Sequence, residues 1–239
     1  WKGLVGSEMC IRDRFDTNKK ILVRFKELIK SHNPYEYLIA FGSIHFLLIP
    51  IIFLKKGTIE LTFNLFVEPE FFNFFYLFTL IGDGWFLVPC ILFIFVYSKY
   101  KNLNYKIEVI NIIIISLIMF LLTSIFKQLL FPEVMRPIKY FSSVLDENWN
   151  VNNFDLTFHR FKSFPSGHTT SASMCGFFIM RYFKNIYSRL IIYLVILFVG
   201  LSRVFLFQHF IIDVYVGVIL GIICVFLGDK IIEKYTKNE

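Results

Sequence analysis

The feature that most constrains this chain is a series of apolar runs, each about as long as a helix that crosses a lipid bilayer. Such a helix needs about 20 apolar residues to span the ~30 Å hydrocarbon layer. The candidates are Tyr37–Leu54, Gly84–Tyr97, Val109–Phe126, Ser166 to about Phe183, Leu190–Leu201 and Phe210–Gly228. We therefore expect an all-α, polytopic membrane protein, built as a bundle of six transmembrane helices.

The composition agrees with this reading. Of the 239 residues, 56% are hydrophobic, 18% are charged and 31 are Phe, whereas soluble domains are about 45–50% apolar and about 25% charged. This excess of apolar surface excludes disordered chains, small secreted disulfide-rich proteins and DNA-binding domains. The four cysteines form no close-spaced pair, so we expect inert thiols and neither a disulfide framework nor a zinc site.

Two local patterns refine the expected bundle. The aromatic-rich stretch 71–81 precedes the second span and predicts a helix in the membrane interface, followed by Asp83 as a helix N-cap. Gly217 and Gly221, four residues apart, and the small residues Thr169–Ser173 predict faces where helices pack closely.

The distribution of basic residues predicts the orientation. More of the 25 Lys and Arg residues flank the side of the bundle that holds both termini than flank the opposite side, and the basic side is usually cytoplasmic. We expect a multi-pass protein of the cytoplasmic (inner) membrane with both termini inside. The one long polar connection, Pro132–Pro165, then faces the periplasm or exterior and is a candidate for function.

The chain divides into four expected segments. Residues Leu4 to Arg14 read LVGSEMCIRDR, which resembles a translated sequencing adapter, so residues 1–14 are left out of functional reasoning. Residues 15–36 are expected to form a cytoplasmic N-terminal segment, 37–230 the six-helix membrane domain, and 231–239 a cytoplasmic tail.

Several ionisable residues lie at the ends of the expected spans. A charge at mid-membrane costs about 2.5–3.5 kcal/mol on insertion scales, so each needs a reason. The residues are Lys127, Arg136, His168, Arg203, His209 and Asp213. In an up-and-down bundle all of these ends emerge on the outward face. Residues some 85 positions apart are therefore expected to meet in one layer.

The chemistry of this layer is that of a phosphate site. His209 and Asp213 are spaced four apart on an expected helix, so the carboxylate can orient the imidazole and leave its other nitrogen free to attack. Three cations can hold a phosphoryl group, and a helix that opens with Ser166-Gly167-His168 favours an anion. Each signal alone is commonly structural; together, on one face, they favour a catalytic site.

These residues resemble the motifs of the type 2 phosphatidic acid phosphatase superfamily. The motif SR-x5-H-x3-D is matched by Ser202, Arg203, His209 and Asp213, and the motif PSGH by residues 165–168. The first motif is usually K-x6-RP, whereas here eight residues separate Lys127 from Arg136 and Pro137. The usual spacing would call for the position of Leu129, which cannot serve.

The resemblance implies phosphate transfer in two steps through a phosphohistidine. His209 would be the nucleophile, Asp213 its partner and His168 the acid for the leaving group. The remaining implied roles are phosphate contacts, assigned to Lys127, Arg136, Ser166, Gly167 and Arg203. The resemblance implies no metal and no cofactor.

The implied activity is hydrolysis of a lipid phosphate or diphosphate, of the phosphatidic acid, phosphatidylglycerol phosphate or polyprenyl diphosphate class. The partners are then the membrane and a lipid phosphate, with no nucleic acid. Two alternatives stay open: a phosphotransferase that uses the same site, and a non-catalytic lipid-binding or transport protein. The related vanadium haloperoxidases share the pocket, but six apolar spans argue against a soluble enzyme of that kind.

Overall fold

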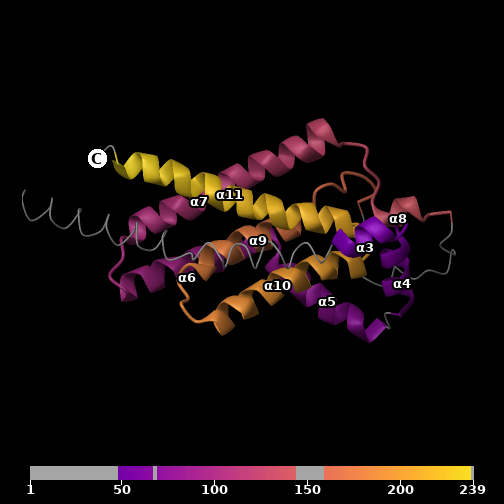
Figure 1. Cartoon of the computed structure of the whole chain (residues 1–239), viewed down its shortest axis with the longest axis horizontal. Coiled ribbons are helices and arrows are strands. Elements are labelled where there is room, and N and C mark those ends of the chain that lie inside the picture. Colours follow the sequence, from indigo (N-terminus) through magenta and orange to yellow (C-terminus); the bar gives the residue numbers. More distant parts are fainter. Residues whose placement is uncertain (1–47, 67–68, 144–158, 238–239) are drawn as a thin grey trace, which may run out of the picture.

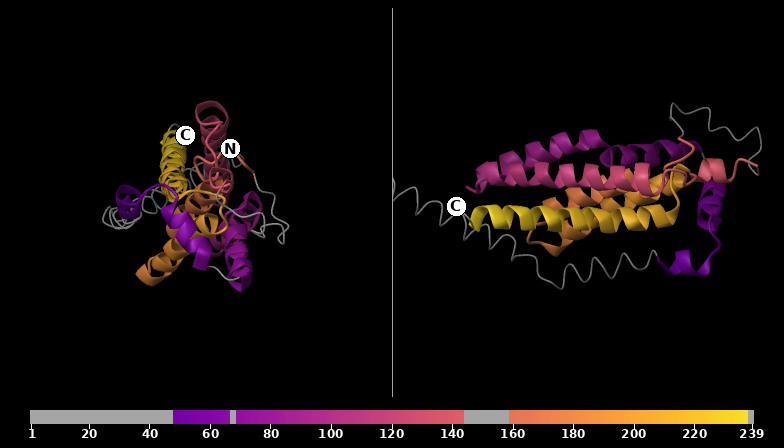
Figure 2. Two further views of the ribbon diagram at one scale, coloured as in Figure 1. Left: turned by 90° about the vertical axis from the view of Figure 1, so that its right-hand side faces the viewer. Right: turned by 90° about the horizontal axis from the view of Figure 1, so that it is seen from above.

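A computed structural model describes residues 48–66, 69–143 and 159–237, and in these residues every regular element is helical. The long helices run along the long axis of the molecule, whereas a short helix at one end lies across it (Figures 1 and 2). Their bounds are α3 Leu48–Phe53, α4 Thr58–Phe66, α5 Pro69–Ile81, α6 Leu87–Tyr100, α7 Tyr105–Ile125, α8 Pro137–Tyr140, α9 Gly167–Met180, α10 Ile186–Phe205 and α11 Ile211–Lys237. A 3-10 turn, Gly84–Phe86, precedes α6, and a π-helical turn, Phe126–Leu130, extends α7.

Three of these helices are long and apolar enough to cross a membrane. They cover Tyr105–Leu130, Ile186–Phe205 and Ile211–Thr236, and a fourth candidate is the pair Asn73–Ile81 and Gly84–Tyr100, which is bent by 53°. Three expected spans thus coincide with α7, α10 and α11. The described part of the chain is all-helical, with the apolar spans of a membrane protein. The six-helix count stays a prediction, because most of the expected first span lies outside the described residues.

Helix α9 packs closely against α11, as the small residues predicted. A Cβ added to Gly217 would lie 2.9 Å from the carbonyl oxygen of Ser166, and one added to Gly221 would lie 2.6 Å from Cβ of Ser173. The small residues 169–173 of α9 are all buried. Although α9 is only 14 residues long, it is the centre around which the other long helices are arranged (Figures 1 and 2).

The break between α5 and α6 occurs where the sequence predicted a cap. The Asp83 carboxylate accepts a hydrogen bond from the N–H of Gly84 at 2.7 Å and so caps the turn that leads into α6. Helix α5 lies along α10, with the ring of Phe75 stacked on Phe205 at 3.8 Å between centroids. Aromatic side chains of α5 are therefore used in helix packing, and its place in the membrane interface stays a prediction.

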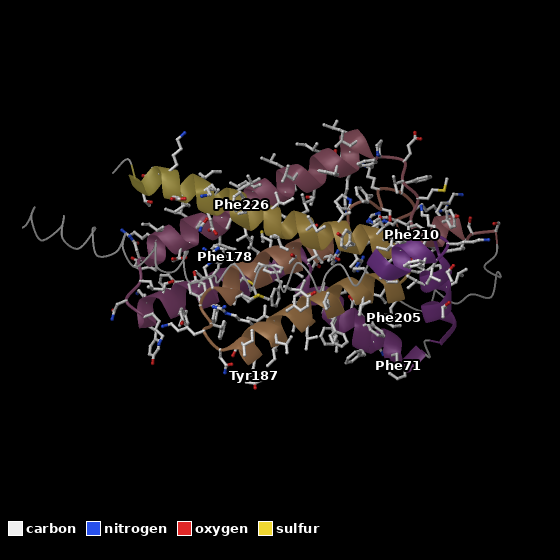
Figure 3. All side chains as sticks on the ribbon, viewed as in Figure 1. Phe71, Phe178, Tyr187, Phe205, Phe210 and Phe226 are labelled. Atoms are coloured by element: carbon white, nitrogen blue, oxygen red, sulfur yellow. The ribbon has the colours of Figure 1, made fainter. Side chains whose placement is uncertain are left out.

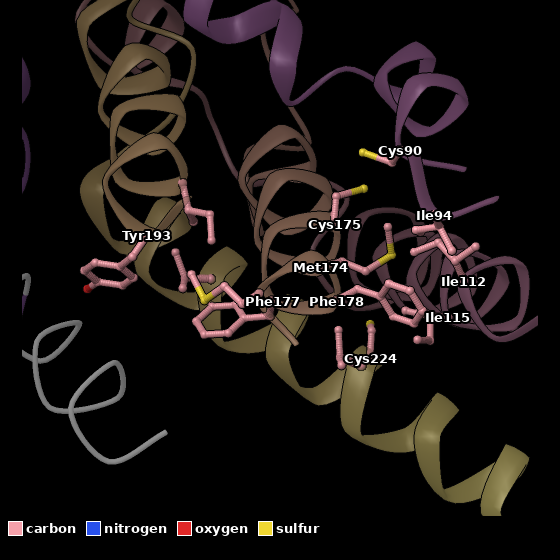
Figure 4. Close-up of a cluster of buried hydrophobic side chains, with 14 of the residues drawn as sticks. Cys90, Ile94, Ile112, Ile115, Met174, Cys175, Phe177, Phe178, Tyr193 and Cys224 are labelled. Atoms are coloured by element: carbon pink, nitrogen blue, oxygen red, sulfur yellow. The ribbon is translucent and has the colours of Figure 1, made fainter. Parts of the chain in front are cut away.

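The main apolar core lies between α6, α7, α9, α10 and α11 (Figure 4). Its largest fully buried members include Phe178, Met174 and Ile196. The thiols of Cys90, Cys175 and Cys224 are free and buried in this region, which confirms the expectation of structural thiols for these three residues. Cys10 lies outside the described residues.

A buried polar network ties three helices together at the end of the bundle opposite to α3 and α8. Arg181 at the end of α9 makes a two-pronged ion pair with Asp229 of α11, at 3.0 and 3.1 Å. Asn111 of α7 donates to the same carboxylate, and the Tyr182 hydroxyl donates to buried Glu108 at 2.7 Å. Arg181 is only 4% exposed, and its charge is paired inside the bundle.

Candidate active site

The predicted site residues come from the ends of α7, α9, α10 and α11 and from the loops that join them, and they lie at the end of the bundle that also holds α3, α4 and α8 (Figures 1 and 2). Four of them act electrostatically on the imidazole of His209: Arg136, Lys127, Arg203 and His168. The structure thus brings residues that are far apart in the sequence to the same end of the bundle. All eight predicted site residues lie in the described part of the chain.

The position of His209 differs from the expected one. Helix α11 begins only at Ile211, so His209 belongs to the turn that follows α10 rather than to a helix. The pair still forms, with Nδ1 of His209 3.4 Å from Oδ2 of Asp213. It forms because Asp213 is in the first helical turn, where its carboxylate reaches back to accept the N–H of Phe210 at 3.0 Å.

A residue that the sequence reading missed completes this pair. Ser163 is fully buried, and its hydroxyl donates to Oδ2 of Asp213 at 2.5 Å. The same hydroxyl oxygen is 3.5 Å from Nδ1 of His209. No spacing rule points to this serine, which lies in a loop only three residues before Ser166. The physical signal is the need of a buried carboxylate for donors.

Asp213 and Ser163 therefore position the imidazole of His209 through one of its two nitrogens. With Nδ1 directed toward Asp213 and Ser163, Nε2 is the nitrogen left to react. Burial, and then the neighbouring cations Arg136, Lys127 and Arg203, lower the pKa of His209 well below that of a free imidazole. At neutral pH its ring is therefore uncharged, as a nucleophile requires.

Arg136 is fixed by its loop. Its Nε donates to the carbonyl oxygen of Phe161 at 3.1 Å and its Nη1 donates to Oε1 of Gln208 at 2.8 Å. Backbone hydrogen bonds also join the segment around Arg136 to the segment before α9. The N–H of Arg136 donates to the carbonyl of Arg160, and the N–H of Ser163 donates to that of Val134. Burial lowers the pKa of Arg136 to about 10, so the guanidinium stays charged at neutral pH.

A side chain of α5 positions Arg203. Its Nη1 donates to Oγ1 of Thr79 at 3.1 Å, and that hydroxyl also bonds with Oγ of Ser202 at 2.9 Å. Among the described residues, Nε of Arg203 and Nε2 of Gln208 are buried without a hydrogen-bond partner. Buried donors of this kind are suited to an anion, because a bound oxygen would satisfy them. Thr79 and Gln208 had no signal in the sequence.

The start of α9 meets Lys127. A Cβ added to Gly167 would lie 3.4 Å from Nζ of Lys127, so this ammonium group lies against the first turn of the helix. Lys127 lies in the π-helical turn Phe126–Leu130, which ends α7 and is followed by the loop to Arg136. Leu129, which the usual motif spacing would select, is 73% exposed.

Ser166 and His168 have different surroundings. The Ser166 hydroxyl caps α9 by accepting the N–H of Thr169, and the Ser166 N–H donates to the carbonyl oxygen of Asp213 at 3.0 Å. Ser166 thus joins the starts of α9 and α11, and its direct contact with phosphate stays a prediction. His168 is half-buried, and a Cβ on Gly82 would be 2.7 Å from its carbonyl oxygen, so the α5–α6 break packs against it.

The site as a whole combines three cations, one carboxylate and two imidazoles. An excess of positive charge beside a neutral nucleophile suits a phosphate dianion. The described residues contain no group of three His, Cys, Asp or Glu that could hold a metal ion.

Comparison with known proteins agrees with these features. The model of the PAP2 superfamily matches residues 106–236, more than half of the sequence. The chain belongs to the PAP2 superfamily. All of the predicted site residues fall within the matched region of this PAP2 protein. No curated protein sequence matches it significantly.

Two solved structures resemble this PAP2 protein. One is LpxE from Aquifex aeolicus, with 26% identity and a TM-score of 0.54, covering 73% of this chain and 94% of that one. The other is a transmembrane PAP2-type phosphatidylglycerolphosphate phosphatase from Bacillus subtilis, with a TM-score of 0.57, covering 91% of this chain and 96% of that one. At 20% identity, the second likeness concerns the fold alone.

Proposed function

We propose that this protein is an integral-membrane phosphatase that hydrolyses a lipid phosphate or diphosphate through a phosphohistidine intermediate. The observation that supports this most is the environment of His209. Its imidazole has Nδ1 directed toward Asp213 and Ser163, and it lies among Arg136, Lys127 and Arg203. Membership of the PAP2 superfamily and the fold of the neighbouring phosphatases agree with a lipid phosphatase.

In the first step, Nε2 of His209 attacks phosphorus, a P–N bond forms and the bond from phosphorus to the lipid oxygen breaks. The negative charge of the bound substrate phosphate offsets the surrounding cations, so that His168 binds a proton. His168 gives this proton to the lipid oxygen, and the lipid leaves as an alcohol. Lys127, Arg136 and Arg203 stabilise the charge that develops on the equatorial oxygens. The first-turn N–H groups of α9, at Gly167, face the same charge.

In the second step, water attacks phosphorus and the P–N bond breaks. His168, now neutral, takes the proton from water, and His209 is restored with the release of inorganic phosphate. Asp213 stabilises the imidazole through both steps, because its carboxylate compensates the positive charge that forms on the ring. No step requires a metal ion or an organic cofactor.

The substrate class follows from the setting of the site at the end of membrane-spanning helices. We propose phosphatidic acid, phosphatidylglycerol phosphate or a polyprenyl diphosphate, each of which combines a phosphate with a hydrocarbon chain. The phosphotransferase alternative uses the same first step with a lipid or sugar hydroxyl in place of water. A non-catalytic lipid-binding or transport role is the third alternative, and the intact His168, His209 and Asp213 argue against it.

The setting in the cell is part of the proposal. We propose a six-helix domain over residues 37–230 in the cytoplasmic membrane, with the site facing the periplasm or exterior. Residues 15–36 and 231–239 would then be cytoplasmic. The excess of Lys and Arg near the termini supports this orientation.

Purified protein in detergent, incubated with these lipid phosphates, tests the activity by release of inorganic phosphate. We expect His209→Ala to abolish release and to abolish acid-labile phosphate on the protein. The matched control is His159→Ala, because His159 is an exposed loop residue. Release that needs an added alcohol acceptor would indicate the phosphotransferase, and turnover retained in His209→Ala would refute the assigned nucleophile.

A further inference from the structure

A cavity of about 220 Å³ lies beside the candidate active site, between the α3–α4 connection and the start of α11. Six apolar residues line it: Ile51, Leu54, Ile59, Phe210, Ile211 and Ile212. The remaining lining comes from the turn and first residues of α4, including Lys55, Lys56 and Glu60.

The cavity and the candidate site share a wall. Phe210 lines the cavity, follows the proposed nucleophile His209 directly, and donates its N–H to Asp213. The next N–H, that of Ile211, donates at 2.8 Å to the buried carboxylate of Glu60. The segment 209–212 therefore has the imidazole of His209 in the candidate active site and its apolar side chains in the wall of the cavity. In Figure 3, Phe210 lies at the end of the bundle beside α3.

The turn that forms the other wall is constrained in shape. Gly57 has φ +93°, and a Cβ there would lie 2.2 Å from the ring of Phe141. This close approach holds the α3–α4 connection against the aromatic cluster of Phe141, Phe207 and Phe210. The cavity is thus bounded by packed elements on both sides.

Positive charge marks the edge of the cavity. Lys55 and Lys56 are both exposed, and Nζ of Lys56 lies 4.4 Å from the ring centroid of Phe210 and 5.2 Å from that of Tyr140. Apart from the buried Glu60 carboxylate, which accepts the N–H of Ile211, the inside of the cavity is apolar, and its rim is cationic. This is the complement of a lipid phosphate, in which a hydrocarbon chain adjoins an anionic headgroup.

We infer that this cavity binds a section of a hydrocarbon chain of the lipid substrate while Lys56 faces the headgroup; the inference rests on the proposed phosphatase function. A volume of about 220 Å³ is below the ~300–1,000 Å³ of pockets that enclose a drug-sized molecule. It therefore holds a section of one chain, not a whole lipid. Because Phe210 forms its wall, a chain bound there leaves its phosphate close to His209.

The test is a pair of neighbouring substitutions on the same connection. Leu54→Trp adds bulk to a residue that lines the cavity and is 45% exposed, whereas Phe53→Trp adds bulk to a residue that is 79% exposed and does not line it. Phosphate release is measured with dioctanoyl phosphatidic acid and with glycerol 3-phosphate, which is the same headgroup without chains. Leu54→Phe is a smaller addition to use if Leu54→Trp does not purify folded.

We expect Leu54→Trp to lower kcat/KM for the dioctanoyl lipid about tenfold or more, mainly through KM, because contacts with several methylene groups are lost. Its activity on glycerol 3-phosphate and both activities of Phe53→Trp should stay within about twofold of wild type. Unchanged kcat/KM for the lipid, or an equal loss on both substrates, would overturn the inference. Wild-type protein that releases phosphate from neither substrate would instead refute the proposed function.

Discussion

Ser163→Ala is the substitution whose effect can be worked out most directly from the structure. It removes the hydroxyl that donates to Oδ2 of Asp213 at 2.5 Å and leaves the Cβ in place, so packing changes little. The hydroxyl is fully buried, and no water can readily replace it. The substitution therefore isolates one hydrogen bond to a carboxylate.

The expected size follows from the energy of such a bond. A hydrogen bond to a charged group contributes about 1.5–3 kcal/mol. If all of it orients Asp213 and through it the imidazole of His209, kcat falls about 10- to 150-fold. We expect KM to change little, because Ser163 does not face the phosphate. The assay is the rate of phosphate release from a lipid phosphate in detergent at several substrate concentrations.

Three controls separate this role from a loss of folding. Ser142→Ala removes an exposed hydroxyl that donates to the carbonyl of Lys139, and it should leave kcat unchanged. Ser163→Thr keeps the hydroxyl and should restore part of the rate. In an Asp213→Asn background, Ser163→Ala should cost much less than in wild type. A kcat within twofold of wild type, or the same loss in both backgrounds, would refute the reasoning.

Two further predictions concern pH and the far end of the bundle. Because the folded-state pKa of His209 is lowered, the unfolded state binds more protons below about pH 6.5, and stability is lost there by up to about 1.4 kcal/mol per pH unit. Thermal unfolding between pH 7.5 and 5.5 should show a smaller loss for His209→Gln than for wild type; equal losses would contradict this. Asp229→Ala leaves the buried Arg181 unpaired and should cost about 3–5 kcal/mol of unfolding free energy, with kcat of the folded protein unchanged. Adding Arg181→Met should recover most of that stability in denaturant unfolding, and no recovery would show that the pair is not the cause.

The sequence predicted the helical architecture well where one physical rule dominated. Hydropathy alone located α7, α10 and α11. An apolar run of about 20 residues is long enough to cross the bilayer as a helix, and few other structures suit so long an apolar segment. The glycines at 217 and 221 predicted a close approach between helices, because nothing larger fits against the backbone of α9. The bent α5–α6 pair was predicted in part, through Asp83 as a cap.

The site was predicted through its charged residues but not through its hydroxyl and amide groups. A buried charge is costly enough to be noticed in a sequence, as with Arg203 and Asp213. Ser163, Thr79 and Gln208 are common residue types in loops or helices, and only the folded chain brings them to the charges that they serve. Spacing rules do not apply to them, because they come from separate elements.

Lys127 shows how a change in spacing can be absorbed. The two residues that this chain has beyond the usual motif lie after Lys127, in the π-helical turn that ends α7 and in the loop to Arg136. Nζ of Lys127 still lies within reach of Gly167. The local winding could not be read from hydropathy, because α and π turns have the same composition.

The placement of His209 in a turn, rather than on α11, gives Oδ2 of Asp213 two tasks. It accepts the N–H of Phe210, which stabilises the start of the helix, and it faces Nδ1 of His209, which orients the nucleophile. On a continuous helix the N–H of Phe210 would be bonded within the helix, and the carboxylate would keep only the Ser163 hydroxyl and the imidazole as partners. The start of α11 and the proposed nucleophile thus share one acceptor atom, Oδ2 of Asp213. The four-residue spacing brings His209 and Asp213 together through this helix cap, and not through the repeat of a continuous helix. The geometry of the reacting nitrogen therefore depends on where α11 begins, and Glu60, which accepts the next N–H, helps to define that point.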